Sequence, residues 1–125
     1  MKTICFSSIK GGTGKSSLCI LTANYAASAG YRVLVADLDL QNSATSYYLD
    51  SPDLADQHNI ATALHSEHLI ENVIPTNYPG IDLLASSLDL VKLRAIGERT
   101  LKRILDTTPL PYDFLFLDTP PTYDN

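Results

Sequence analysis

The chain has 125 residues and a mass of 13.6 kDa, which suits one domain covering residues 1–125. With 45% hydrophobic and 18% charged residues, its composition excludes a disordered chain. The net charge of −5 argues against non-specific binding to DNA or anionic membranes by this chain alone, because such binding requires a basic surface. No apolar run approaches the ~20 residues that span a bilayer, so we expect a cytoplasmic protein without a membrane partner.

Short apolar segments alternate with helical patterns along the chain. Strands are predicted over residues 3–8, 32–37, 81–85 and 113–118, and helices over residues 15–29, 60–64 and 90–105. The second and fourth strands are continuously apolar, which is typical of strands covered on both faces in parallel sheets. The alternation predicts an α/β fold with a doubly wound, mostly parallel sheet. The two cysteines, Cys5 and Cys19, lie in apolar segments without metal-ligand spacing and are expected to be buried.

A glycine-rich segment stands between the first strand and the first helix. It reads Lys10-Gly11-Gly12-Thr13-Gly14-Lys15-Ser16-Ser17. Glycines let backbone N–H groups converge on phosphate oxygens, and the start of a helix adds further donors and a positive dipole end. Lys15 supplies a charge for β- and γ-phosphates, and Ser16 supplies a hydroxyl for Mg²⁺. The usual phosphate-loop pattern has a glycine where Ile9 stands, whereas this chain has an additional lysine, Lys10.

Three aspartates follow the predicted strands closely. Asp37 ends the second strand, Asp39 comes two residues later, and Asp118 ends the fourth strand. Any one of them can be explained as the cap of a turn or helix. Ligands of parallel sheets bind at the carboxyl ends of the strands, where the phosphate loop also lies. We therefore expect all three carboxylates to converge on one site for a cation and phosphates.

The glycine-rich segment resembles the deviant Walker A motif of the ParA/Soj/MinD family of partitioning and positioning ATPases. Residues 33–45, which read VLVADLDLQNSAT, are similar to the family's D-x-D-P-Q motif, with Leu40 in place of the common proline. Residues 112–121, which read YDFLFLDTPP, are similar to its Walker B strand. The resemblance covers nearly the whole chain, and Gln41 and Thr45 favour the ParA/Soj branch.

The resemblance implies a P-loop NTPase-like fold that is truncated after the Walker B strand, because family members continue well beyond it. We accordingly expect this chain to be the N-terminal portion of a larger ATPase. Later strands would lie beyond the first strand, so residues 3–8 should form an exposed edge. The helix over 15–29 should likewise expose an apolar patch.

The implied function is an ATP hydrolase that depends on Mg²⁺ and acts in plasmid or chromosome partition. Lys15 and the loop amides would hold the β- and γ-phosphates, and Asp39 would orient the attacking water. The predicted magnesium site consists of Ser16, Asp37 and Asp118. By resemblance, Ser17 contacts the α-phosphate, and Lys10 reaches the partner's phosphates in an ATP-dependent homodimer. The implied partners are a ParB-like activator and nucleoid DNA.

Three questions remain open from the residues alone. The chain carries the phosphate chemistry but no recognisable group for adenine, so it could be a nucleotide-binding or interaction module that does not hydrolyse. The choice between ATP and GTP is not derivable either. Lys92, Arg99 and Arg103 share one face of the predicted helix over 90–105, and they form either a solvated face or a DNA-contacting stripe.

Overall fold

The computed structural model describes residues 1–6, 14–39, 43–50, 55–56, 58–66, 69–86, 103 and 110–119. Residues 10–13, which carry the first half of the predicted phosphate loop, lie outside the described residues. The predicted helix over 90–105 lies outside them as well, apart from residue 103.

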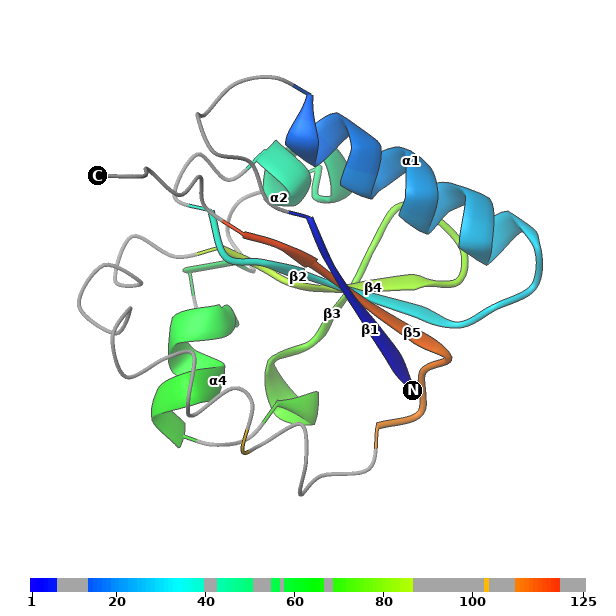
Figure 1. The fold of residues 1–125 in the computed structure, drawn as a ribbon. Coiled ribbons are helices and arrows are strands. Elements are labelled where there is room, and N and C mark those ends of the chain that lie inside the picture. Colours follow the sequence, from blue (N-terminus) through cyan, green and yellow to red (C-terminus); the bar gives the residue numbers. More distant parts are fainter. Residues whose placement is uncertain are drawn as a thin grey trace, which may run out of the picture.

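Five strands and four helical segments make up the described fold (Figure 1). The strands are β1 (Lys2–Phe6), β2 (Val33–Asp37), β3 (Ile74–Pro75), β4 (Ile81–Leu84) and β5 (Phe114–Asp118). The helices are α1 (Lys15–Ser28), α2 (Ser43–Tyr48) and α4 (Ile60–Ser66), with a 3₁₀ turn, η1 (Ile70–Asn72). The four predicted strands correspond to β1, β2, β4 and β5, and α2, η1 and β3 were not predicted.

The strands form one sheet in the order β1-β5-β2-β4-β3. All neighbours are parallel except β3, which runs antiparallel to β4. Helices α1 and α2 cover one face of the sheet and α4 covers the other (Figure 1). The predicted doubly wound, mostly parallel α/β fold is therefore confirmed.

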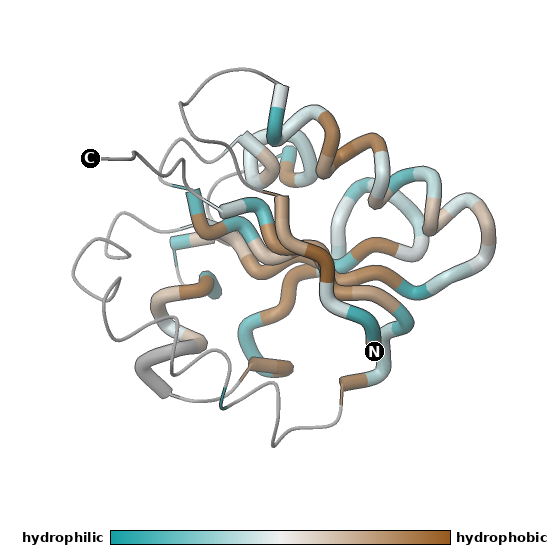
Figure 2. The backbone as a smooth tube through the Cα atoms, viewed as in Figure 1, coloured by the Kyte–Doolittle hydropathy of each residue, from teal (hydrophilic) through white to brown (hydrophobic). Residues whose placement is uncertain are grey.

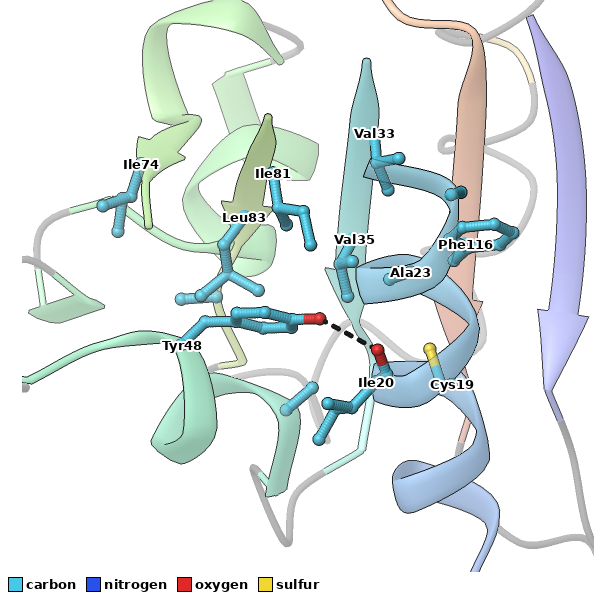
Figure 3. Close-up of a cluster of buried hydrophobic side chains, with 13 residues drawn as sticks. Cys19, Ile20, Ala23, Val33, Val35, Tyr48, Ile74, Ile81, Leu83 and Phe116 are labelled. Carbon is cyan, nitrogen blue, oxygen red and sulfur yellow. Dashed lines mark hydrogen bonds between the residues drawn. The ribbon is translucent and has the colours of Figure 1, made fainter. Parts of the chain in front are cut away.

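Strand β2 shows why a strand covered on both faces is apolar along most of its length, since all five of its residues are buried and only the last, Asp37, is polar. Val33 and Val35 pack under α1 and α2 together with Phe116 of β5 and Tyr48 of α2 (Figure 3). The alternate residues of the same strand, Leu34 among them, pack against α4 on the opposite face. Figure 2 shows the resulting concentration of hydrophobic residues in the central strands.

Helix α1 is bounded by two glycines with left-handed backbones. Gly14, at φ +78°, precedes its first turn, and Gly30, at φ +99°, follows its end. The amides of Gly30 and Tyr31 donate to the carbonyls of Ala27 and Ala26, which is the Schellman arrangement. Gly30 thus ends α1 directly after the helix that was predicted over residues 15–29.

Only one face of α1 rests on the sheet. Its buried side chains are Cys19, Ile20, Ala23 and Ala26. Leu18, Leu21 and Tyr25 lie on the outer face and are 57%, 65% and 77% exposed. The outer face of α1 therefore exposes large apolar side chains, as was expected of the helix over 15–29.

Strand β1 lies at the end of the described sheet and pairs only with β5 among the described strands. This is the edge position that was expected for the first strand. The edge also explains an error, because Cys5, expected to be buried, is exposed on β1 while Cys19 is buried in α1. No helix among the described residues is long and apolar enough to cross a bilayer.

We expect Phe116→Ala to lower the free energy of unfolding by about 3–5 kcal/mol, because it removes a buried aromatic side chain from the core. The Phe116 ring stacks on Phe114 at 5.7 Å and meets the edge of Phe6 at 5.8 Å. Tyr25→Ala, at an exposed position, is the control and should change stability by less than about 0.5 kcal/mol. Urea unfolding measures both, and equal midpoints would contradict this packing.

Candidate functional site

The candidate site lies where two central strands end and the first helix begins. Asp37 and Asp118 are the last residues of β2 and β5 and are register partners across the two strands. Lys15 and Ser16 open α1 and reach across to the end of β5. The parallel topology thus brings together side chains from segments that are far apart in the sequence, as the positions of the aspartates predicted.

Lys15 is enclosed by oxygen atoms. Its Nζ donates to Asp39 Oδ2 at 3.0 Å, to Asp118 Oδ1 at 2.5 Å and to the carbonyl oxygen of Thr119. Burial lowers the pKa of Lys15, but the hydrogen bonds and charges of Asp118 and Asp39 more than offset this, so the pKa is raised. The ammonium therefore stays charged and neutralises two largely buried carboxylates.

Ser16 and Asp118 offer adjacent hard oxygen atoms. Ser16 donates from Oγ to Asp118 Oδ2 at 2.7 Å, while the other oxygen of Asp118 accepts from Lys15. The described residues contain no group of three or more His, Cys, Asp and Glu side chains that could hold a metal ion. The residues nevertheless fit Mg²⁺, which typically takes one or two protein ligands and completes its shell with waters and phosphate oxygens.

Asp37 is fully buried, and its carboxylate faces the loop that follows β2. Oδ1 accepts from the Asp39 amide at 3.1 Å, and Oδ2 accepts from the amide and hydroxyl of Thr45 at 2.9 and 2.7 Å. Burial raises the pKa of Asp37 to about 6, although these hydrogen bonds lower it. The bonds therefore reduce the cost of holding a carboxylate in the interior.

Ser86 also belongs to this region, and sequence reasoning did not assign it to the site. It lies two residues beyond the end of β4, where its amide donates to Thr45 Oγ1 at 2.9 Å. Its own hydroxyl donates to the Asp39 carbonyl oxygen at 2.7 Å. Its position in the sequence could have indicated this, because a serine just past a parallel strand lies at the edge of the sheet where the other site residues lie.

The phosphate loop is described only from Gly14 onward. Gly14 accepts the first helical hydrogen bond from Leu18 at 2.9 Å, and no side chain caps α1 at this residue. Ser17 is exposed on the first turn. The predicted positions Lys10, Gly11, Gly12 and Thr13 lie outside the described residues. The described half of the loop thus presents the amino end of a helix beside Lys15, an arrangement suited to anions.

Comparison with known proteins identifies relatives that match nearly the whole length of this chain. A family model described as "AAA domain" matches residues 1–125. A ParA family protein from Chlamydia trachomatis serovar D is 36% identical, over 98% of this chain and 51% of that protein. A virulence plasmid ParA family protein from Chlamydia psittaci is 31% identical, over 98% of this chain and 49% of that protein.

Two groups of solved structures have the same fold. A plasmid partition protein from Borrelia burgdorferi bound to AMPPNP superposes with a TM-score of 0.82 and 32% identity, over 97% of this chain and 54% of that one. Cobyrinic acid a,c-diamide synthase from Mycobacterium smegmatis, with an ATP analogue and magnesium, gives a TM-score of 0.85 and 25% identity over 98% and 52% of the two chains.

The chain spans about half the length of the relatives it matches. The family model covers every residue, and the ParA-like motifs at residues 10–17, 33–45 and 112–121 all fall within that match. The chain therefore belongs to this AAA-domain family and is a ParA-like P-loop protein.

Proposed function

We propose that this chain is the nucleotide-binding part of a ParA-like ATPase that depends on Mg²⁺ and acts in plasmid or chromosome partition. One observation carries the proposal: the lysine of the phosphate-loop pattern lies between two carboxylates at the carboxyl ends of parallel strands. The related partition protein solved with AMPPNP and the related synthase solved with magnesium support the same ligands here.

The ion pairs of Lys15 with Asp39 and Asp118 must break before Lys15 can bind a nucleotide. To reach the β- and γ-phosphates, its ammonium exchanges Asp39 and Asp118 for phosphate oxygens, which leaves the two carboxylates without their cation. Buried carboxylates are costly without a counter-charge, so Asp118 and Ser16 then favour a divalent cation. Nucleotide and Mg²⁺ are consequently expected to bind interdependently, with Asp37 supporting the water shell of the ion.

Asp39 is the candidate for orienting water during hydrolysis. Once Lys15 has moved to the phosphates, the Asp39 carboxylate can accept a hydrogen bond from a water in line with the γ-phosphate. Mg²⁺, when bound, supplies neutralisation of the charge that develops on the phosphate oxygens. The protein contributes position and electrostatics, because phosphoryl transfer to water requires no covalent intermediate.

We propose an ATP-dependent homodimer and two further partners as part of the same function. Lys10 would reach the phosphates of the partner across an ATP-dependent homodimer, and Ser17 would contact the α-phosphate. A ParB-like activator and nucleoid DNA are the proposed partners. These roles rest on the motif resemblance and on the relation to ParA family and plasmid partition proteins.

A second candidate function is nucleotide binding without hydrolysis. It requires only the phosphate-binding groups, Lys15 and the amino end of α1, and no residue that orients water. A chain that binds ATP with Mg²⁺ but releases no phosphate would support it.

We expect Asp39→Ala to retain ATP binding but to lower the rate of turnover by a factor of about 10² or more, because water positioning acts only in the transition state. Calorimetry measures binding, and phosphate release in a single turnover measures hydrolysis. Asp56→Ala, at an exposed aspartate, is the matched control and should behave like the wild type.

The outcomes separate the candidates. Unchanged single-turnover hydrolysis by Asp39→Ala would show that another group orients the water. ATP binding without hydrolysis in the wild type would favour the second candidate. A wild-type chain that does not bind ATP in the presence of Mg²⁺ would contradict both.

A further inference from the structure

A closed ring of hydrogen bonds lies beside the Lys15 contacts. Four residues form it, and all are buried: Asp37 is 0% exposed, Thr45 6%, Asp39 7% and Ser86 8%. Asp37 and Asp39 come from the end of β2 and the residues directly after it, Thr45 comes from helix α2, and Ser86 comes from the segment after β4. The ring therefore joins three separate parts of the fold at the edge of the sheet where the candidate site lies.

The hydrogen bonds of the ring have ordinary lengths of 2.7 to 3.1 Å. The Asp39 amide donates to Asp37, which also accepts from the amide and hydroxyl of Thr45. The Thr45 hydroxyl oxygen accepts from the Ser86 amide, and the Ser86 hydroxyl donates to the carbonyl oxygen of Asp39. The ring begins and ends on the main chain of one residue, so both the N–H and the C=O of Asp39 are held.

This arrangement has a consequence for the Asp39 side chain. A residue whose amide and carbonyl are both bonded has little freedom of rotation about its backbone, so the direction of its Cα–Cβ bond is fixed and the positions open to its carboxylate are limited to a few rotamers. In the nucleotide-free chain the carboxylate contacts the Lys15 ammonium, 3.0 Å from Asp39 Oδ2. Buried polar groups favour a single conformation when all are bonded and destabilise the fold when some are not, so the ring should hold firmly.

We propose that Thr45 and Ser86 are positioning residues that set the Asp39 carboxylate for hydrolysis of the nucleotide. The inference rests on the proposed function, in which Asp39 orients the attacking water. The Thr45 hydroxyl donates to Asp37 and the Ser86 hydroxyl donates to the Asp39 carbonyl oxygen, so neither donates to Lys15 or Ser16, the residues proposed to hold the phosphates and Mg²⁺. Loss of the ring should therefore slow turnover more than it weakens nucleotide binding, since a displacement of about 1 Å can cost up to about 10² in rate.

Thr45→Val tests the ring with little change of shape. It removes both the donor to Asp37 and the acceptor for the Ser86 amide, whereas Thr45→Ser retains both. We expect Thr45→Val to lower kcat by about 10- to 100-fold while the Kd for ATP with Mg²⁺ changes by less than about threefold. Thr45→Ser should restore turnover to within about threefold of the wild type.

Ser86→Ala is the gentler second variant, because it removes only the bond to the Asp39 carbonyl oxygen. We expect kcat to fall by about 10-fold with nucleotide affinity retained. Its control is Ser28→Ala on α1, where an exposed serine makes a similar 2.8 Å bond to the Tyr25 carbonyl oxygen, remote from the site. Ser28→Ala should hydrolyse ATP at the wild-type rate.

Hydrogen exchange of the Asp39 amide gives a readout that does not require turnover. In the nucleotide-free protein, NMR should show faster exchange at Asp39 in Thr45→Val and Ser86→Ala than in the wild type, with α1 amides unchanged. Wild-type exchange at Asp39 in both variants would overturn the proposal. Wild-type kcat in both, or a loss of ATP affinity equal to the loss of kcat, would overturn it as well.

Two further outcomes remain decisive. If Thr45→Val does not fold, as judged by circular dichroism, Ser86→Ala and its control decide between the outcomes above. If the wild type binds ATP without hydrolysing it, the proposed hydrolysis is wrong, and the role in positioning for hydrolysis falls with it. The exchange measurement then still decides whether the ring holds the Asp39 main chain.

Discussion

The contact between the Lys15 ammonium and the carboxylates of Asp39 and Asp118 is the interaction on which the site depends. It joins residues 24 and 103 positions apart in the sequence, at the point where α1 meets the ends of β2 and β5. Two buried carboxylates close together are costly without a positive charge between them, and Lys15 supplies that charge. In the proposed reaction Lys15 exchanges these carboxylates for phosphate oxygens, so charge balance links the nucleotide-free structure to that reaction.

Asp39 is held in two independent ways. Lys15 binds its carboxylate, while Asp37 and Ser86 bind its main chain, with Thr45 connecting the two. If Lys15 moves to a nucleotide, as proposed, the main-chain hydrogen bonds of Asp39 are still in place to position this residue. In the proposed reaction, the ring would keep Asp39 in position while Lys15 changes partners.

Much of the fold could be predicted from the sequence, because its signals are local. The continuous apolar run of β2 requires cover on both faces, and Gly30 ends α1 in the left-handed conformation that glycine accepts readily. The placement of Asp37 beside Asp118 follows from the parallel topology of β2 and β5. Phosphate and metal roles for these residues remain predictions, as does everything assigned to Lys10.

The remainder depends on tertiary contacts that no local pattern encodes. Helix α2 has six residues and β3 has two, too few for a periodic signal. Cys5 lies in an apolar segment but belongs to the edge strand, so it is exposed. Ser86 makes its bonds to residues 41 and 47 positions away, and only the packing of β4 beside β2 reveals that it belongs to the site.

The most direct test of the central claim is calorimetric titration of ATP into the wild-type chain and Lys15→Ala, each with and without Mg²⁺. The wild type should bind ATP much more tightly with Mg²⁺ than without it, because movement of Lys15 leaves carboxylates that favour a divalent cation. Lys15→Ala should not bind ATP under either condition, and Lys2→Ala, at an exposed lysine of β1, should bind like the wild type. ATP binding by a folded Lys15→Ala with wild-type affinity would contradict the account.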